Sequence, residues 1–370
     1  MIFEHLDRGY YLSRVLRRMI RRWRNLLVLC ILAGLSTFLL VELVSFPSEY
    51  WNCQFFQALS APSIHLVLAA MSWNDLEWTK HLKVPNLRVI PYIANRPTAK
   101  YHPPSNRGNE AISYLTYIYE FYDKLPDIAI FTHGSDWSWH IDGALNYSTA
   151  YAIEHFDLDE VRRRQYVNLR VSWLRACPNW INTSVTTWSA DVDPKLRPEE
   201  RFMKTAFQEN FPRDPVPLIL SQPCCSQFAV TREAIQSNSR EQYKMQIDWL
   251  QNTRLESEVS GRVWEHMWQW LFIKKAIDCP SEHKALCRAY HICFENEEDW
   301  TRWRDLESEK FNISDHRNAM LMNGVQPYNE AVLTLDWEIQ EYDERLEPWR
   351  QKAIERGGSA EKRLEIAGDV

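Results

Sequence analysis

The sequence predicts a three-layer α/β domain with a largely parallel sheet, preceded by one transmembrane helix. Three features lead to this prediction: an uncharged apolar run near the N-terminus, short apolar runs typical of buried strands, and a long amphipathic helix between two of those runs. The order strand, strand, helix, strand with short connections is typical of an α/β layer. The chain has 370 residues, 45% of them hydrophobic, which is enough for a substantial core.

The N-terminal segment predicts a membrane anchor. Residues 1–25 carry seven arginines against two acidic residues and are expected to form a cytosolic basic tail. Residues 26–46 are almost free of charge and approach the ~20 residues of a membrane-spanning helix. The arginine excess keeps the N-terminus in the cytosol. A cleaved signal peptide is the alternative, but its charged region is usually shorter and small residues precede its cleavage site.

We therefore expect a single-pass type II membrane protein of the endoplasmic reticulum or Golgi, whose C-terminal body is lumenal. A short membrane span suits the thinner membranes of the early secretory pathway. Residues 47–62 are expected to form a stem, and residues 63–295 a lumenal α/β domain. Three N-x-S/T sequons in this body predict N-glycosylation at Asn146, Asn182 and Asn312.

Cysteine usage agrees with a lumenal body. Seven of the eight cysteines follow the anchor, and an oxidising compartment favours their pairing. Because seven is odd, one lacks a partner within the chain, and Cys53 near the anchor is the candidate. The cysteines expected in disulfides are Cys177, Cys224, Cys225, Cys279, Cys287 and Cys293. Since a bond between adjacent cysteines is strained, Cys224 and Cys225 are expected to bond to distant partners such as Cys177 or Cys279. The spacing of the last three cysteines and the compartment argue against a zinc site.

The lumenal elements follow from hydrophobic periodicity. Continuous apolar runs predict strands, and apolar residues at spacings of three and four predict helices. Strands are expected at residues 64–73, 87–95, 127–131 and 166–174, with two short strands around the Pro-Cys-Cys turn at 223–225. Helices are expected at residues 109–125, at 198–211 and after Ser260. Residues 296–370 lack a strong apolar run and predict a peripheral helix followed by a disordered tail.

Composition narrows the choice of partners. The net charge is −6, which argues against nucleic acid, because its binding proteins need a basic surface. The 17 tryptophans are many for this length. Tryptophan is mostly a core and interface residue, but exposed tryptophans also stack on sugar rings. On this basis the expected partners are the membrane and a carbohydrate.

Several motifs, taken in order, resemble a known family. They read NRGNEAISYLTYIYEFYDKLPDIAIFTHG, YVNLRV, ACP, PCCSQFAVTREAI and SGRVWEHMWQWLF, followed by Cys-Pro and two further cysteines. This order resembles a mostly fungal family catalogued as domain of unknown function 3431, over residues 64–295. The resemblance implies a secretory or membrane-anchored protein of glycosyltransferase-like character, so a glycosyltransferase A-type fold is expected. Where that family usually has His-Gly-His, this chain has Ser135-Asp136 in place of the second histidine.

The strand at 127–131 runs into polar residues that are candidate site residues. Binding groups gather where parallel strands end, and His133 and Asp136 follow this strand. We expect His133 to contact substrate and, with a catalytic Asp136, to hold Mn²⁺ or Mg²⁺ that neutralises a leaving diphosphate. A hydrogen-bonded structural loop is the alternative. The Asp-x-Asp sequences at 157–159 and 191–193 follow no apolar strand and are interpreted as solvated.

The helix after Ser260 carries a second set of candidates. Its polar residues Arg262, Glu265, His266 and Gln269 recur at spacings that form one narrow stripe on an otherwise apolar helix. We expect Glu265 to be the catalytic base, with His266 and Gln269 in contact with substrate. The alternative is that this stripe is only the solvated edge of the helix.

Arg107 completes the candidate site, because it precedes the helix at 109–125, and a helix N-terminus binds phosphate. Together these residues predict an enzyme that transfers a sugar from a nucleotide sugar. One alternative is a non-catalytic carbohydrate- or protein-binding module on the same fold. Another is a lumenal metal-dependent hydrolase with His133, Asp136 and His140 as metal ligands.

Overall fold

The computed structural model describes residues 61–187 and 196–368. The predicted cytosolic tail, the membrane anchor, almost all of the stem, and Cys53 lie outside these residues. Within the two described stretches, no helix combines the length and apolar character needed to cross a membrane. The predicted anchor at 26–46 therefore stays a prediction.

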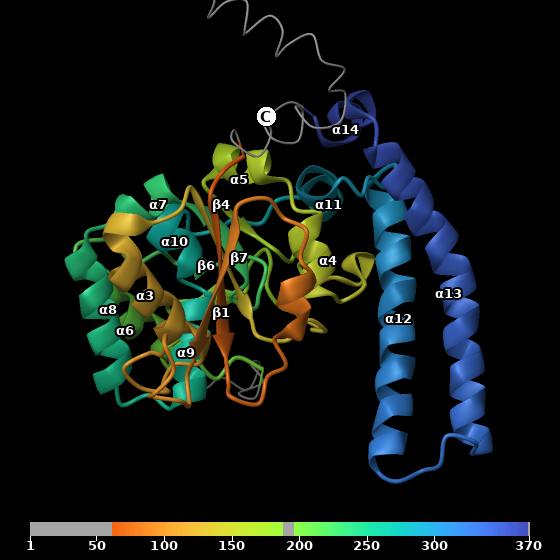
Figure 1. The fold of residues 1–370 in the computed structure, drawn as a ribbon, viewed down its shortest axis with the longest axis horizontal. Helices are drawn as coiled ribbons and strands as arrows, with labels where there is room; N and C mark the ends of the chain where they lie inside the picture. The colour runs from red at the N-terminus through yellow and green to blue at the C-terminus, as the bar shows by residue number, and fades with distance from the viewer. Residues whose placement is uncertain (1–60, 188–195, 369–370) are drawn as a thin grey trace, which may run out of the picture. The chain divides into compact units, whose positions relative to one another are not determined.

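A five-stranded sheet forms the centre of the described chain (Figure 1). Its strands, in spatial order, are β2 (Leu87–Ile93), β1 (Ile64–Ala70), β3 (Ile128–His133), β7 (Phe228–Thr231) and β4 (Tyr166–Asn168). Strand β1 runs parallel to both of its neighbours, whereas β7 runs antiparallel to β3 and to β4. A separate two-stranded sheet joins β5 (Ile181–Asn182) to β6 (Ile219–Leu220). The predicted mixed α/β fold with a parallel-rich sheet is confirmed.

Both faces of the sheet are buried, which makes the domain three-layered. Successive side chains of a strand point to opposite faces, and on β3 Ile128 and Ile130 enter one core while Ala129 and Phe131 enter the other. This burial on both faces explains why the strands read as continuous apolar runs rather than alternating ones.

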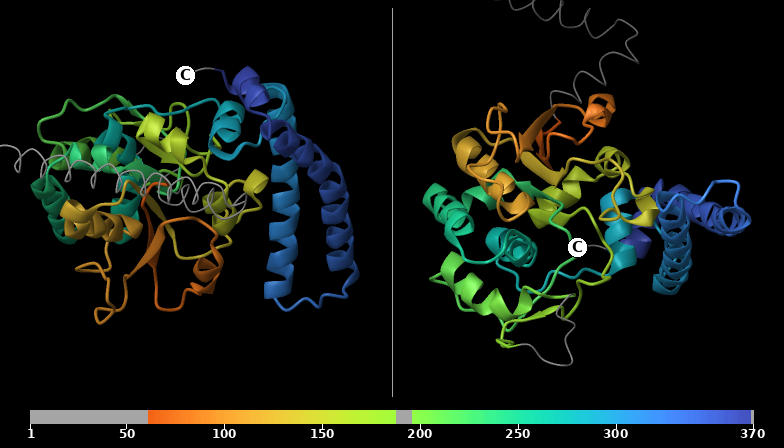
Figure 2. Two further views of the ribbon diagram at one scale, coloured as in Figure 1. Left: turned by 45° about the horizontal axis from the view of Figure 1, so that its top comes forward. Right: turned by 90° about the horizontal axis from the view of Figure 1, so that it is seen from below.

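Helices cover each face of the sheet, as the views in Figures 1 and 2 show. The helices that share the core with Phe131 are α3 (Glu110–Phe121), α6 (Met203–Asn210), α7 (Arg232–Gln236), α8 (Arg240–Asn252), α9 (Ser257–Glu265) and α10 (Trp268–Ile273). The helices that pack against the opposite core are α4 (Thr149–Glu154), α5 (Leu158–Arg164) and α11 (Glu282–Tyr290), together with parts of α12 (Glu297–Met322) and α13 (Glu330–Gly357). The helix expected at 109–125 is confirmed as α3 with a short 3-10 extension.

The helix expected after Ser260 differs from the prediction, because it is broken. Helix α9 ends at Glu265, and α10 starts only at Trp268. Arg262 and Glu265 therefore belong to a different helix from Gln269, and the four polar residues do not form one continuous stripe. The break puts Glu265 at a helix C-terminus.

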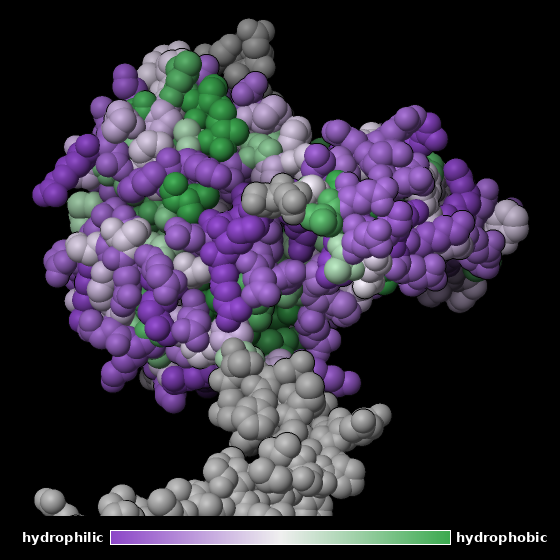
Figure 3. All heavy atoms as spheres, turned by 90° about the horizontal axis from the view of Figure 1, so that it is seen from above, coloured by the Kyte–Doolittle hydropathy of each residue, from purple (hydrophilic) through white to green (hydrophobic). Residues whose placement is uncertain are grey.

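The C-terminal region also differs from the prediction, because it is helical almost to its end. Helices α12 (Glu297–Met322) and α13 (Glu330–Gly357) form an antiparallel hairpin, followed by α14 (Ala360–Ala367) (Figures 1 and 2). Ion pairs also join the two helices of the hairpin, such as the one between Arg317 Nε and Asp336 Oδ1 at 2.8 Å. The face in Figure 3 is mostly hydrophilic over these helices. Their apolar contacts with the domain core come from a few residues, among them Trp300, Trp303 and Leu346, so the sequence shows no long apolar run there.

Three disulfides join the six described cysteines: Cys177–Cys279, Cys224–Cys225 and Cys287–Cys293. The prediction that these six cysteines pair is confirmed. The prediction that Cys224 and Cys225 bond to distant partners is wrong, because they bond to each other. The structure accommodates this turn with left-handed backbone at Cys225 (φ 88°) and Ser226 (φ 51°).

Candidate functional site

The carboxyl end of β3 presents a pair of histidines. His133 is the last residue of β3, and its Nδ1 lies 2.9 Å from Nδ1 of His140 in the following loop. Burial lowers the pKa of His133, and burial together with His133 and Arg170 lowers the pKa of His140 to about 3. Both rings are therefore neutral near pH 7, so one Nδ1 donates and the other accepts. His133 also approaches Glu110, with 3.8 Å between Nε2 and Oε2.

The first turn of α3 is held against α9. Gly108 has a left-handed φ of 70°, and its amide donates to the Ser257 hydroxyl at 2.9 Å. A Cβ on Gly261 would lie only 2.5 Å from the side-chain nitrogen Nδ2 of Asn109, so only glycine permits this close approach of the two helices. Because Glu110 follows Asn109 and Glu265 lies one turn after Gly261, the two carboxyls come into electrostatic contact.

Arg107 maintains this arrangement rather than projecting into solvent. Its guanidinium donates to the main-chain carbonyls of Gln251, Thr253 and Leu255, at the end of α8 and in the loop that leads to α9. The predicted substrate-binding role of Arg107 stays a prediction. The structure gives it a definite positioning role, since it ties the start of α3 to the segment that leads into α9.

Glu265 has the most perturbed carboxyl group of the candidate residues. Burial, together with the nearby carboxyls of Glu110 and Glu199, raises the pKa of Glu265 to about 8, against the opposing effects of Arg262 and the Cys225 amide. A raised pKa means that the fold disfavours the charged form. We call Glu110, His133 and Glu265 the Glu265 corner. Such a carboxyl, poised near neutrality beside a second one, is typical of acid–base sites.

The Cys224–Cys225 turn joins the corner to a buried arginine. The Cys225 amide hydrogen-bonds the Glu265 carboxyl, and the Cys225 sulfur lies 3.7 Å from an Arg170 nitrogen. Arg170 in turn donates to the Trp139 carbonyl at 3.2 Å and lies over the Trp139 ring at 5.7 Å. Since the Trp139 ring contacts His140, the contacts return to the histidine pair. The corner and this arginine thus form one closed series of contacts.

Asp136 occupies a different setting in the same loop. Its Oδ1 accepts hydrogen bonds from the Ser148 hydroxyl and the Ala150 amide, both at 2.8 Å, and its carbonyl accepts from the Thr149 amide. We call this arrangement the Asp136 turn. It satisfies main-chain groups at the start of α4, as a helix cap does. In residues 61–187 and 196–368, no three His, Cys, Asp or Glu side chains lie close enough together to hold a metal ion. The predicted cation therefore stays a prediction.

His266 and Gln269 lie behind the corner. His266 Nε2 is 3.0 Å from Glu199 Oε1, and both side chains are buried. Burial alone would raise the pKa of Glu199, but its bonds to His266 and the charge of Arg262 lower it overall. Gln269 is fully buried and donates to the carbonyls of His266 and Ala276. These contacts stabilise the break between α9 and α10, at which Glu265 lies. The predicted substrate contacts of His266 and Gln269 stay predictions.

Glu110 and Arg170 are the main residues that the sequence analysis missed. Glu110 resembles any acidic residue in the first turn of a helix, and only the Asn109–Gly261 approach shows its role. Gln227 was likewise unassigned. It is fully buried, and its Oε1 accepts from Thr132 and from the His133 amide, while its Nε2 has no hydrogen-bond partner. An orphaned buried donor beside His133 is a feature that a bound ligand or water would satisfy.

The predicted glycosylation sites differ in accessibility. Asn146 and Asn312 are exposed, which a glycan requires. Asn182 is half-buried, and its side chain accepts hydrogen bonds from the amide and hydroxyl of Ser184. All three positions stay predictions.

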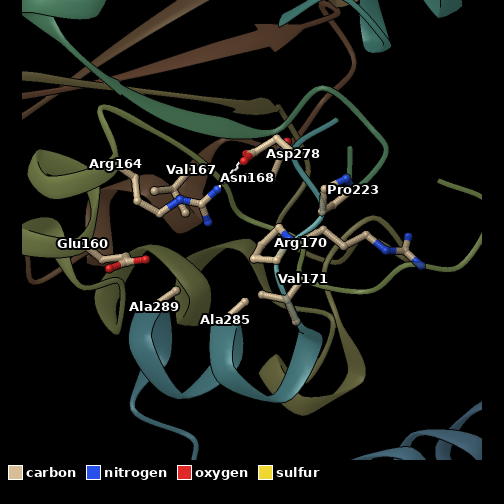
Figure 4. Close-up of a pocket in the computed structure, with 11 residues that line it drawn as sticks. Glu160, Arg164, Val167, Asn168, Arg170, Val171, Pro223, Asp278, Ala285 and Ala289 are labelled. Carbon is tan, nitrogen blue, oxygen red and sulfur yellow. Dashed lines mark hydrogen bonds and ion pairs between the residues drawn. The ribbon is translucent and has the colours of Figure 1, made fainter. Parts of the chain in front are cut away.

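A small hollow beside β4 is lined by none of the three corner residues (Figure 4). Arg164 points across it to Asp278, and both carboxylate oxygens lie 2.7 Å from one Arg164 nitrogen. Arg170 contributes its stem, while its guanidinium points away from the hollow (Figure 4). Because the one cation directed into the hollow is already paired, the hollow does not form an anion site.

The fold and the corner define a class of protein: a three-layer α/β protein with a carboxyl pair and a histidine pair at the carboxyl edge of its sheet. The chain belongs to the family described as "Protein of unknown function (DUF3431)", which matches residues 66–288. The resemblance seen in the sequence motifs is confirmed at the level of the family. No curated protein and no solved structure matches the chain.

Proposed function

We propose that this protein transfers a sugar from a nucleotide sugar to a carbohydrate acceptor, with Glu265 as the base that takes the proton of the acceptor hydroxyl. The acceptor oxygen then forms its bond to the anomeric carbon, and the bond between that carbon and the diphosphate breaks with its electron pair on the leaving group. The reaction would take place in the lumen of the endoplasmic reticulum or Golgi, on a type II membrane protein of glycosyltransferase A-type fold.

The observation that carries this proposal is the Glu265 corner itself. A general base must be ionised part of the time near the working pH and must lie where substrate can reach it. Glu265 meets the first requirement through burial and its carboxyl neighbours. Its place at the carboxyl edge of a parallel-rich sheet supports the second, because α/β proteins bind ligands along this edge. The neighbouring His133 is partly exposed and supplies a neutral hydrogen-bonding ring.

The described residues offer the predicted cation few protein ligands. Asp136 Oδ1 already accepts two hydrogen bonds, and no three-ligand group exists in the described residues. Magnesium ions in enzymes are often held by one or two carboxylates together with substrate phosphates. The proposed reaction therefore has no step at a cation, and the arms with Mn²⁺ or Mg²⁺ in the experiment below test whether His133 and Asp136 hold one.

Thermal unfolding of the purified full-length chain tests the proposal, with UDP-glucose, UDP-galactose, UDP-N-acetylglucosamine and GDP-mannose, each with and without Mn²⁺ or Mg²⁺. A ligand that binds the folded state raises the melting temperature. We expect one nucleotide sugar to do so and to be turned over, with turnover lost in Glu265→Gln and retained in Glu258→Gln, an exposed glutamate of the same helix. If no nucleotide sugar raises the melting temperature or is consumed, the proposal fails.

A second candidate function is glycoside hydrolysis, and the carboxyl pair Glu110–Glu265 is the observation that favours it. Glycosidases use two carboxyls, one of which must be protonated to donate to the leaving oxygen. Glu265 would then act as the acid. Release of sugar from a glycan without any nucleotide sugar would support this function. Binding of a glycan with neither reaction would leave a non-catalytic binding module.

A further inference from the structure

We propose that Trp137 and Trp139 form a stacking platform for an oligosaccharide acceptor, which leads into the Glu265 corner. The identity of the ligand as an acceptor rests on the proposed function. The platform itself rests on the geometry of the loop after β3.

The two tryptophans are exposed side chains of the loop that follows β3. Trp137 is 62% and Trp139 49% exposed, whereas Ser138 between them is only 8% exposed. Two exposed indoles that flank one buried residue belong to the same stretch of loop surface, so neighbouring sugar rings of one oligosaccharide would each meet one indole. Large aromatic side chains that remain exposed next to a polar site indicate binding rather than packing.

Both rings are held in place before any ligand arrives. The Trp139 ring lies 4.0 Å from the His140 ring and 5.7 Å from the Arg170 guanidinium. Trp137 pairs through its main chain with Ser148, and its ring lies 6.2 Å from that of Tyr147. A platform of ordered side chains loses little conformational entropy when it binds.

The platform is continuous with the corner. Trp139 is followed by His140, whose Nδ1 bonds to His133, and His133 approaches Glu110. A glycan stacked on the two indoles would thus place its end toward the proposed base. This continuity commits the platform to a substrate of the site, in preference to an unrelated protein partner.

The surroundings of the platform suit an uncharged polyhydroxyl ligand. Trp73, which is 72% exposed, follows the neighbouring strand β1, and Asn74 beside it donates to the Ser135 hydroxyl at 3.3 Å. Asn95 likewise donates to Ser72 at 3.0 Å. Amide and hydroxyl groups pair with sugar hydroxyls, while the indole faces cover the apolar faces of the rings. A lipid surface would instead require a wider apolar patch.

Calorimetry on the full-length chain, without nucleotide sugar, tests the platform. The probes are mannohexaose, laminarihexaose and chitohexaose, each compared with its monosaccharide. We expect at least one hexaose to bind at least tenfold more tightly than its monosaccharide. The Trp137→Ala/Trp139→Ala double variant should weaken this binding at least tenfold, whereas Trp337→Ala should leave it unchanged. Trp337 lies on α13 and is 73% exposed, which makes it a matched control.

Each outcome bears on one proposal at a time. Chain-length-dependent binding that the double variant abolishes supports the platform even when no sugar transfer is detected, and the proposed function alone then fails. Absence of tighter hexaose binding, or an equal loss in Trp337→Ala, overturns the platform even when transfer occurs. An unchanged melting temperature of the double variant shows that its loss of binding is not a loss of folding.

Discussion

Two carboxylates near the same edge of the sheet have opposite surroundings. Asp136 receives a hydroxyl and an amide and serves the start of α4. Glu265 faces two other carboxyls and is only partly compensated by Arg262 and the Cys225 amide. The sequence analysis treated both as catalytic candidates. The Asp136 turn uses its carboxylate to complete the fold, whereas the Glu265 corner holds a carboxyl group whose charged form the fold disfavours. This difference is a physical reason to place the chemistry at Glu265.

The largest expected effect tests whether the corner is catalytic. Replacement of Glu265 by Gln keeps the shape of the side chain and removes the proton exchange. We expect nucleotide-sugar turnover to fall by about 10²- to 10⁴-fold, the range that general base catalysis contributes. The pH profile sharpens the assignment: a base requires its ionised form, so the wild-type rate should rise with pH through about 8. A rate that instead falls through this pH would identify Glu265 as an acid and favour hydrolysis.

The next effect concerns stability. The pKa of Glu265 is raised in the folded state from 4.5 to about 8, so the unfolded chain loses this proton first as the pH rises. The contribution of Glu265 to stability is therefore fully present below pH 4.5 and is lost as the pH rises through about 8. Relative to the wild type, the unfolding free energy of Glu265→Gln should rise by on the order of 4 kcal/mol between these pH values. Denaturant unfolding at several pH values measures this gain, and parallel curves for the two proteins would contradict the assigned environment.

A third test alters how the corner is assembled. Gly261→Ala would place a Cβ 2.5 Å from the side-chain nitrogen Nδ2 of Asn109 and 2.9 Å from the Asn109 Cβ. Helix α9 must therefore move away from the start of α3. We expect a loss of about 1 to 3 kcal/mol in unfolding free energy, as overpacking typically costs, together with reduced turnover. Gly358→Ala is the control, because its nearest neighbour would lie 3.2 Å away. Full activity in Gly261→Ala would show that the corner does not need this contact.

The smallest effect belongs to the Asp136 turn. Asp136→Ala removes an acceptor of two hydrogen bonds and should lower the unfolding free energy by about 1 to 2 kcal/mol, as loss of a helix cap does. The pH at which turnover is half-maximal should be the same in Asp136→Ala as in the wild type. Asp159→Ala, which removes an exposed carboxylate of α5, serves as the control. If Asp136→Ala abolishes turnover at unchanged stability, Asp136 is catalytic as the sequence suggested, and the comparison is broken.

The sequence by itself determined the layers of the fold and one essential residue of the proposed site. Apolar runs identify β1, β2 and β3, and three- and four-residue spacings identify α3, because burial on both faces and on one helix face leaves a local pattern. Glu265 was also identifiable, since a charged residue amid tryptophans on a buried helix is conspicuous.

Only the tertiary structure decided which polar residues meet. Glu110 and Glu265 lie far apart in the sequence. The close approach of Gly261 to Asn109 brings them together, and no local sequence pattern indicates that approach. The hairpin of α12 and α13 likewise depends on contacts between residues that are distant in sequence. The Cys224–Cys225 bond forms in a turn with left-handed backbone at Cys225, which the sequence alone does not indicate. Periodicity reports which face of an element is buried, but it does not report what the buried face contacts. The setting of a charge, which separates Glu265 from Asp136, is therefore a property of the assembled fold.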